Sequence, residues 1–257
     1  MSAALEATLA SGPRLQPGEV WLVGAGPGDP ALLTLEAVRV LAQAEVVVHD
    51  ALVDPRVLDF APASAERIHA GKRGGRPSPA QQDITENLVS LARAGRRVVR
   101  LKGGDPFIFG RGGEEVSGLA AAGVPFRIAP GLTAGLAALT AAGVPATLRG
   151  VNQAILLTTG HPAPGQPEPD WAAMARLGQP IVFYMAVRKL QAISRALMAG
   201  GLAAETPAAV IASATTPDQR VLVSTLGAVA ADAQAASLAA PAIVVVGDIV
   251  AARELAE

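Results

Sequence analysis

Short apolar runs alternate with helix-like segments along the first half of the chain. The strand-like runs cover residues 20–23, 46–49 and 98–101, and the helix-like segments cover residues 32–44 and 78–94. Such alternation is typical of βαβ units, which build a parallel sheet. The segment 78–94 also has clear helix ends, because Ser78 can cap it, Pro79 suits its first position and Gly95 follows it. The pattern predicts an α/β fold.

The same pattern restarts in the second half of the chain. After one more run at residues 124–128 and the Pro130-Gly131 turn, strand-like runs cover residues 155–159, 181–185, 208–212, 221–225 and 243–246. The segment 213–220 is too short for a crossover helix, so the strands on either side of it should form an antiparallel hairpin. We therefore expect a parallel sheet followed by a mixed sheet. The expected organisation is a flexible tail at residues 1–18, an N-terminal α/β domain at 19–130 and a C-terminal α/β domain at 131–257.

Composition excludes several classes of protein. The net charge of −1 gives no global attraction to nucleic acid or to an anionic membrane. The chain has no cysteine, and its three histidines lack metal-ligand spacing, so we expect no metal site. The amino terminus has neither a basic region nor a long apolar core, which argues against a signal peptide or a membrane anchor. These features predict a cytoplasmic protein.

The segment 100–115, RLKGGDPFIFGRGGEE, is the strongest candidate for a ligand-binding loop. It holds five glycines and six charged residues directly behind a strand-like run. Open α/β sheets bind ligands at the carboxyl ends of their strands, and Gly103 and Gly104 stand at such an end. Asp105 precedes a proline, which restricts it to a turn-like geometry. We expect the Asp105 carboxylate to be presented to a ligand.

A second glycine-rich segment, GAGPGDP at residues 24–30, resembles a dinucleotide-binding turn, with Asp50 at the end of the next strand. The match is poor, since Asp29 stands where the third glycine is needed and Pro27 lacks an N–H for a phosphate. A tight strand-to-helix turn is the simpler interpretation. A dinucleotide-dependent oxidoreductase nevertheless stays as an alternative from a different class.

Two further features complete the candidate sites. The segment PGLTAG at residues 130–135 is another strand-to-helix turn. Basic residues lie in or beside the glycine-rich loops, at Lys72, Arg73, Arg76, Arg100, Lys102, Arg111 and Arg149. Each alone would be a solvated surface charge. Clustered together, they would suit a polycarboxylate or phosphate ligand.

Together these loops resemble one known family. The segments GAGPGDP, HDALV, GKRGG, RLKGGDPFIFGRGGEE, PGLTAG, TGH and FYM are similar in order and spacing to those of the uroporphyrinogen-III C-methyltransferases, which are tetrapyrrole methylases. The resemblance runs from about residue 20 to residue 253. It implies a homodimer of two-domain α/β subunits, with the active site in the cleft between the domains.

The resemblance also implies a reaction. Two methyl groups would pass from S-adenosylmethionine to C2 and C7 of uroporphyrinogen III, giving precorrin-2 for cobalamin or siroheme synthesis, with S-adenosylhomocysteine as the cofactor product. Alternatives in the same fold are a later corrin-ring methylase, such as a precorrin-4 methyltransferase, and more distantly the diphthine or ribosomal RNA branch. The alternative without catalysis is a dimer that only binds a ligand.

Site residues follow from positions that match the family's motifs. Asp50 and Lys72 match the proton acceptor and donor. The cofactor contacts would be Pro27, Gly103, Gly104, Asp105, Ile108, Thr133, Ala134, Met185 and Ala214. The substrate carboxylates would be bound by Arg73, Arg76, Arg100, Arg111 and Arg149. Because S-adenosylmethionine has no phosphate, bare backbone plus one carboxylate suits its amine and hydroxyls, which would explain the poor dinucleotide match.

The chain departs from the family pattern at three positions. The family often has a tyrosine at or near Thr140, a histidine at Leu148 and a tyrosine at His49. These differences concern the substrate side more than the cofactor side. They leave the regiochemistry and the extent of the second methylation open.

Overall fold

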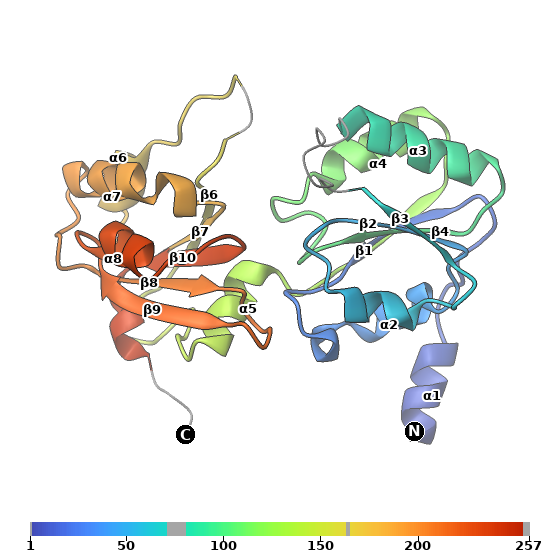
Figure 1. Cartoon of the computed structure of the whole chain (residues 1–257), viewed down its shortest axis with the longest axis horizontal. Coiled ribbons are helices and arrows are strands. Elements are labelled where there is room, and N and C mark those ends of the chain that lie inside the picture. The colour runs from blue at the N-terminus through green and yellow to red at the C-terminus, as the bar shows by residue number, and fades with distance from the viewer. Residues whose placement is uncertain (1, 71–80, 163–164, 254–257) are drawn as a thin grey trace. The chain divides into compact units, whose positions relative to one another are not determined.

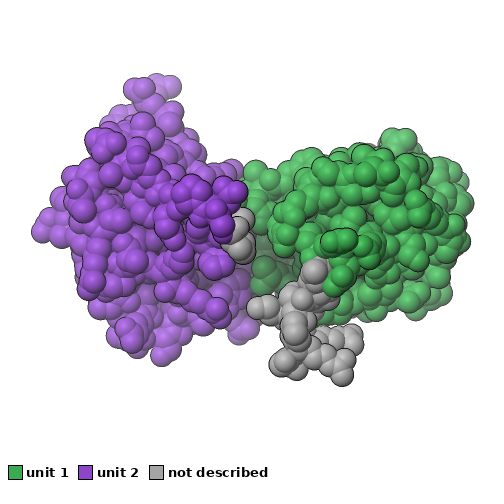
Figure 2. All heavy atoms as spheres, turned by 90° about the horizontal axis from the view of Figure 1, so that it is seen from above, with its two compact units in different colours: residues 1–133 green, residues 134–257 purple. Residues whose placement is uncertain are grey.

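The computed structural model describes residues 2–70, 81–162 and 165–253, and it divides the chain into two compact units (Figure 2). The first unit covers residues 1–133 and the second covers residues 134–257. This boundary lies three residues after the expected one. Each unit is described on its own.

The first unit contains a five-stranded, all-parallel sheet. Its strands are β1 (Val20–Gly24), β2 (Val46–His49), β3 (Glu66–His69), β4 (Val98–Lys102) and β5 (Phe126–Ala129), in the spatial order β3-β2-β4-β1-β5. The predicted parallel sheet is confirmed. The sequence ERIH of β3 was not predicted as a strand, because it has charged residues and lies at the sheet edge, where Glu66 and Arg67 are exposed.

Helices cover both faces of this sheet (Figure 1). The helical segments are α1 (Ala3–Ala10), η1 (Pro30–Leu32), α2 (Leu35–Leu41), η2 (Pro55–Phe60), α3 (Gln81–Arg93) and α4 (Gly112–Ala121). Side chains alternate along β1, so that Trp21 and Val23 share a core cluster with α2, whereas Val20 and Leu22 share one with α3 and α4.

The neighbouring strands β1 and β4 therefore send their connections to opposite faces of the sheet. The chain leaves β1 towards α2 and leaves β4 towards α4. Ligands bind at such a switch point in open α/β sheets, beyond the carboxyl ends of the strands. The fold thus brings the segments 24–30 and 103–111 together at the edge where a ligand site is expected.

Helix α3 ends as the sequence predicts. Gly95 has a φ of +76°, and the N–H groups of Gly95 and Arg96 donate to the carbonyls of Ala92 and Leu91. These are the two hydrogen bonds of a glycine-terminated helix end. The predicted cap, Ser78 and Pro79, lies outside the described residues.

The structure differs from the expectation of a flexible tail at residues 1–18. Helix α1 lies within this segment, and Leu15 is buried in the core with its N–H bonded to the Gln43 side chain. The Gln16 N–H also donates to the Glu19 carboxylate. Residues 15–18 are therefore held by the first unit.

The second unit contains the expected mixed sheet. Its strands are β6 (Leu156–Thr159), β7 (Ile181–Tyr184), β8 (Pro207–Ala212), β9 (Arg220–Thr225) and β10 (Ala242–Val246), in the order β6-β7-β10-β8-β9. Strands β6 and β7 are parallel, the other pairs are antiparallel, and β8 and β9 form the predicted hairpin.

Helices also cover both faces of the second sheet (Figure 1). The helical segments are α5 (Ala134–Ala141), α6 (Trp171–Arg176), η3 (Val187–Lys189), α7 (Leu190–Ala199), α8 (Val229–Ala235) and η4 (Asp248–Ala252). Helices α6, α7 and α8 share one core cluster, and α5 and η4 share the other. Across the described parts of both units, no helix has the length and apolar character needed to span a bilayer.

Candidate active site

Three loops of the first unit meet backbone to backbone at the carboxyl edge of its sheet. Gly26 and Gly104 form an antiparallel bridge, with N···O distances of 2.7 and 3.2 Å. A Cβ on Gly24 would stand 2.4 Å from the Gly131 nitrogen, and one on Gly131 would stand 2.2 Å from the Gly104 oxygen. Real Cβ atoms do not come this close to backbone, so these glycines are required by loop packing alone.

Asp105 ties two of these loops together. Its Oδ1 accepts a hydrogen bond from the Phe107 N–H at 2.8 Å, and its Oδ2 accepts one from the Gly131 N–H at 3.1 Å. A carboxylate has about four acceptor positions, so two are left for a ligand. Asp105 thus has a structural task besides the predicted recognition of a ligand.

The loop after Asp105 exposes apolar side chains beside polar backbone. The exposed fractions are 53% for Phe107, 37% for Ile108 and 40% for Phe109. Phe109 and Arg111 have positive φ angles of 53° and 58°, which are costly for residues other than glycine. A loop held in this conformation, with apolar groups outside, can bind a ligand that has both apolar and polar parts.

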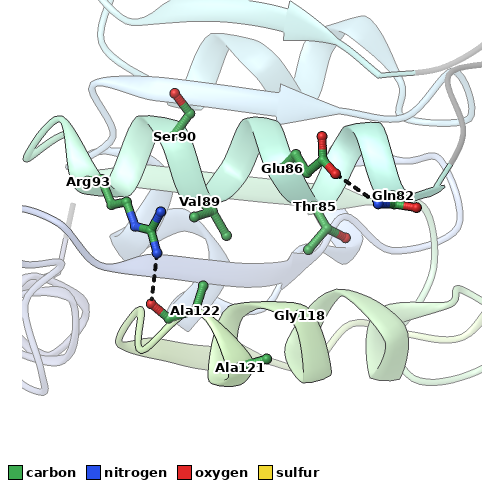
Figure 3. A pocket seen from close by; sticks show the side chains of 9 residues that line it. All are labelled: Gln82, Thr85, Glu86, Val89, Ser90, Arg93, Gly118, Ala121 and Ala122. Atoms are coloured by element: carbon green, nitrogen blue, oxygen red, sulfur yellow. Dashed lines mark hydrogen bonds between the residues drawn. The ribbon is translucent and has the colours of Figure 1, made fainter.

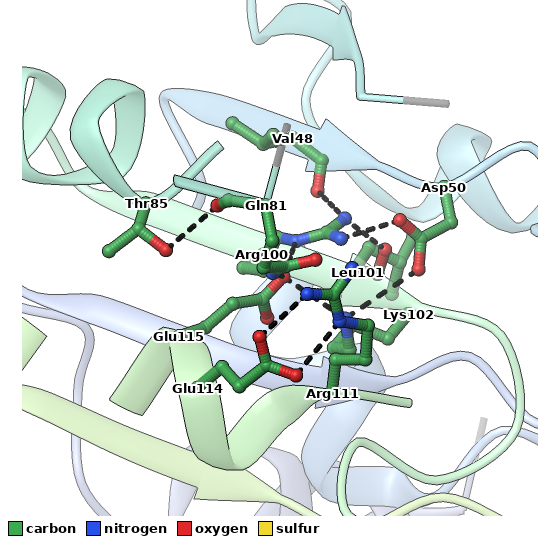
Figure 4. A network of polar contacts seen from close by, with 10 residues as sticks. All are labelled: Val48, Asp50, Gln81, Thr85, Arg100, Leu101, Lys102, Arg111, Glu114 and Glu115. Atoms are coloured by element: carbon green, nitrogen blue, oxygen red, sulfur yellow. Dashed lines mark hydrogen bonds and ion pairs between the residues drawn. The ribbon is translucent and has the colours of Figure 1, made fainter. Parts of the chain in front are cut away.

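Behind the loop lies a buried network of charged side chains (Figure 4). Arg100 is 1% exposed, and it donates from Nε to Glu115 Oε1 at 3.0 Å and from Nη2 to Asp50 Oδ1 at 2.5 Å. Its Nη1 also reaches the carbonyls of Val48 and Leu101. This differs from the expectation that Arg100 binds substrate, because its guanidinium is covered and is directed at protein acceptors.

Lys102 belongs to the same network. Its Nζ donates to Glu115 Oε1 at 3.1 Å and lies 3.8 Å from Asp50 Oδ2. Burial and the neighbouring Arg100 lower the pKa of Lys102, although Asp50 and Glu115 oppose the change. The Asp50 side chain is 29% exposed, so it is the member of this network that solvent reaches.

Two histidines stand beside Asp50. The rings of His49 and His69, at the ends of β2 and β3, contact edge to face with centroids 5.2 Å apart, and His49 Nδ1 lies 3.2 Å from the Asp50 carbonyl oxygen. Burial lowers the pKa of His49, although the contact with Asp50 opposes this. A packing role fits His49.

The remaining basic residues divide into two groups. Arg111 and Arg149 are exposed, and Arg111 pairs with Glu114 through two hydrogen bonds of 2.6 and 2.8 Å. Lys72, Arg73 and Arg76 lie outside the described residues.

Of the other predicted cofactor residues, Pro27 is half-buried in the loop after β1 and Thr133 ends the first unit, whereas Ala134, Met185 and Ala214 belong to the second unit. Strands β7 and β8 both run antiparallel to β10, so their carboxyl ends lie at one edge of the sheet. Met185 follows β7 and is 52% exposed with a φ of +55°, and Ala214 follows β8 between Ser213 and Thr215, which also have positive φ. The Met185 side chain is therefore exposed to solvent and is not part of the core of the second unit.

Helix α5 begins near the same edge. The Gly135 N–H donates to the Tyr184 hydroxyl at 2.9 Å, and a Cβ on Gly135 would stand 2.2 Å from that oxygen. Tyr184 therefore anchors the start of α5. Ala134 and Thr133 are half-buried beside it in sequence.

A hollow of about 600 Å³ lies elsewhere, between α3 and α4 (Figure 3). Its lining includes Gln82, Thr85, Arg93 and Gly118. A Cβ on Gly118 would stand 2.3 Å from the Thr85 side chain, so Gly118 allows the two helices to approach closely. None of the described residues predicted for the site lines this hollow, which we interpret as a surface feature of helix packing.

Sequence reasoning missed Glu115 as a site residue. Arg100 and Lys102 are two positions apart in a buried strand, so they share one face of the sheet and require a buried counter-charge. Glu115, in the first turn of the helix that follows, provides it. That spacing was the available signal.

Comparison with known proteins agrees with this arrangement. The family described as Tetrapyrrole (Corrin/Porphyrin) Methylases matches residues 19–230. A uroporphyrinogen-III C-methyltransferase of Sinorhizobium sp is 54% identical over 94% of this chain and 87% of its own length. A siroheme synthase of Stutzerimonas stutzeri is 47% identical over 92% of this chain, which spans 51% of that protein.

Solved structures give the same result. A Thermus thermophilus uroporphyrin-III C-methyltransferase complexed with S-adenosylhomocysteine is 40% identical, with a TM-score of 0.79 over 91% of this chain and 99% of its own. A cobalt precorrin-4 methyltransferase is 25% identical, with a TM-score of 0.82 over 91% of this chain and 96% of its own. With the parallel and mixed sheets, the glycine-rich edge and these matches, the chain belongs to the tetrapyrrole methylase family.

Proposed function

We propose that this chain is an S-adenosylmethionine-dependent uroporphyrinogen-III C-methyltransferase. It would transfer methyl groups to C2 and C7 of uroporphyrinogen III and give precorrin-2. The observation that carries the proposal is the 54% identity over 94% of the chain with a relative of that name. The product would serve cobalamin or siroheme synthesis.

The residues of each unit suit the cofactor. In the first unit the edge offers backbone polar groups at the partly exposed Gly103, spare acceptor positions on Asp105 and an exposed Ile108, while Gly104 lets the loops come close through its bridge to Gly26. Those groups match an amine, ribose hydroxyls and an apolar surface better than they match a phosphate. Pro27, Thr133, Ala134, Met185 and Ala214 complete the proposed set. When bound, S-adenosylmethionine supplies an electrophilic methyl group.

Asp50 is the proposed proton acceptor. Methylation of a pyrrole carbon leaves positive charge on the ring, and a nearby carboxylate stabilises that charge and then takes the proton. Asp50 is partly exposed and is held by Arg100, so its carboxylate is both accessible and oriented. Lys72 is the proposed donor, from the resemblance alone.

The substrate carboxylates need cations at the surface. Arg111 and Arg149 meet this requirement, since both are exposed and Glu114 engages only two of the five N–H donors of Arg111. Arg73 and Arg76 are proposed from the resemblance. We assign Arg100 to holding Asp50 instead of binding substrate.

Anaerobic incubation with uroporphyrinogen III and S-adenosylmethionine tests the proposal. Mass spectrometry should show two added methyl groups, and an unchanged mass would refute it. A precorrin-4 methyltransferase is the second candidate, favoured by the TM-score of 0.82, and methylation of precorrin-4 in a parallel reaction would establish it.

Calorimetry tests the different-class alternative. Tight binding of S-adenosylhomocysteine without binding of NADH would exclude the dinucleotide-dependent oxidoreductase. We also propose a cytoplasmic homodimer on the strength of the resemblance, which light scattering of the purified protein would test.

A further inference from the structure

The buried charges behind Asp50 form a small, closed set. Glu115 Oε1 accepts three hydrogen bonds, from Arg100 Nε at 3.0 Å, Lys102 Nζ at 3.1 Å and Gln81 Nε2 at 2.9 Å. Both cations then extend to Asp50, through Arg100 Nη2 at 2.5 Å and Lys102 Nζ at 3.8 Å. Two cations thus lie between an enclosed carboxylate and a partly exposed one (Figure 4).

Stability alone does not explain this arrangement. Arg100, Lys102 and Glu115 are at most 2% exposed, and taking such charges out of water costs several kcal/mol per ion. Apolar side chains of similar volume are often as stable or more stable at buried positions of this kind. Among the four charged members of the set, Asp50 is the one whose side chain is partly exposed.

Glu115 is one of two carboxylates that face Lys102. Arginine does not lose its proton in proteins, whereas a buried lysine can. Burial and Arg100 lower the pKa of Lys102, and the nearby carboxylates Asp50 and Glu115 oppose that change. Without Glu115, the two cations would share Asp50 as their sole carboxylate, and Lys102 would release its proton more readily.

We propose that Glu115 is a positioning residue, which acts through Arg100 and Lys102 to fix the orientation and the ionised state of the Asp50 carboxylate. This inference rests on the proposed function, in which Asp50 accepts the proton released from the substrate ring. Glu115 itself is fully buried and does not touch the substrate.

Among the described residues, the other titratable groups near Asp50 come from β2, β3, β4 and α4. His49, the last residue of β2, directly precedes Asp50, and its ring contacts that of His69 on β3. The charged partners Arg100 and Lys102 come from β4, and Glu115 comes from α4. The exposed pair of Arg111 and Glu114 stands at the start of α4. The segment 71–80 is outside the described residues.

The substitution Glu115→Gln removes the charge with little change of shape. Oε1 remains an acceptor for its three donors, and Oε2, which is buried without a hydrogen-bond partner among the described residues, becomes the amide nitrogen. The exposed Glu86→Gln on α3 is the matched control. Lys102→Met removes one cation, and the double variant Glu115→Gln with Lys102→Met restores the balance of one cation and one carboxylate.

We expect Glu115→Gln to lower kcat on the order of tenfold, a fraction of what general base catalysis contributes, with S-adenosylhomocysteine affinity kept. The alkaline limb of kcat/KM should move to lower pH, because Lys102 deprotonates earlier and its hold on Asp50 is lost. Lys102→Met should instead move the acid limb to higher pH, since Asp50 loses a cation. The double variant should lie closer to the wild type than Glu115→Gln does.

A titration independent of turnover completes the test. The Asp50 carboxyl, assigned by its loss in Asp50→Asn, is followed by carbon-13 NMR in each variant. A raised Asp50 pKa in Lys102→Met and a partial return in the double variant would support the inference. The inference would be overturned if the limbs of the kcat/KM pH profile and the Asp50 titration did not shift in the variants. It would also be overturned if the loss of kcat in the double variant equalled the product of the losses in the two single variants. Should Glu115→Gln fail to fold, an unchanged acid limb and an unshifted Asp50 titration in Lys102→Met would still overturn the inference, because Glu115 can act on Asp50 only through Arg100 and Lys102. Failure of wild-type methylation would instead refute the proposed function.

Discussion

The substitution Gly131→Ala tests whether the glycine-rich edge is built by packing between loops. The new Cβ would stand 2.2 Å from the Gly104 oxygen and 2.8 Å from the Gly24 Cα. Ordinary contact begins at 3.4 Å, so the loops after β4 and β5 would have to separate by more than 1 Å, from 2.2 to 3.4 Å. The neighbouring atoms are backbone at the ends of central strands, which a rotamer change cannot move.

The expected cost follows from this geometry. Overpacking of a well-packed site typically costs about 1–3 kcal/mol. The separation also weakens the hydrogen bond from the Gly131 N–H to Asp105, whose net worth is about 0.5–1.5 kcal/mol. We therefore expect the unfolding free energy of the first unit to fall by about 2–4 kcal/mol.

The matched control is Gly113→Ala in α4, where a Cβ would meet nothing within 4 Å. Its backbone is helical and needs no positive φ, so alanine should stabilise the unit by about 0.4–1 kcal/mol. The two substitutions are chemically identical and differ only in surroundings.

The two tryptophans make the assay specific to one unit. Trp21 lies in the core of the first unit and Trp171 in that of the second, so a Trp171→Phe background leaves fluorescence that reports on the first unit. Urea titrations give the midpoints, and calorimetry gives the affinity for S-adenosylhomocysteine. If Gly131→Ala unfolds at the same midpoint as the parent, or if Gly113→Ala is equally damaging, the packing argument is refuted.

Three further predictions concern single side chains. Asp105→Ala should weaken S-adenosylhomocysteine binding and lower stability by about 1–3 kcal/mol, because the N–H groups of Phe107 and Gly131 lose their acceptor; calorimetry and urea titration check both. Asp50→Asn should lower turnover while cofactor binding is retained, and loss of cofactor binding would contradict its proposed role. Burial lowers the pKa of His49 in the folded chain, so at mildly acidic pH the unfolded chain binds a proton that the folded chain does not. The free energy of unfolding should therefore fall as the pH drops below about 6.5. His49→Gln should reduce this pH dependence in urea titrations, and an unchanged dependence would contradict the prediction.

Much of the fold could be predicted because apolar runs mark buried strands. Among the described residues, every strand except β3 falls on a run that the sequence reveals. The hairpin of β8 and β9 was predictable from chain length alone, because eight residues cannot form a crossover. Strand β3 was missed since an edge strand needs few apolar residues, and ERIH has two charged ones.

The candidate site was less predictable, for a physical reason. The glycines at the sheet edge indicated close approach, but the sequence could not show that Gly24, Gly104 and Gly131 approach one another. A ligand and a second loop impose the same demand on a glycine. The partner of Asp105 at Gly131 is likewise distant in sequence and became visible only with the three-dimensional arrangement.

Arg100 shows most clearly how burial changes an assignment. As one of several cations near a loop, it looked suited to an anionic substrate. Its position in β4, however, alternates with Val99 and Leu101, so its side chain points under α4 and meets Glu115 instead of solvent. Because a buried cation requires a partner, each such residue in a central strand implies a carboxylate on the covering element. In this chain Glu115 is linked through Arg100 and Lys102 to Asp50, the partly exposed carboxylate of the same network, so the strand that supports the loop also sets the electrostatics of Asp50.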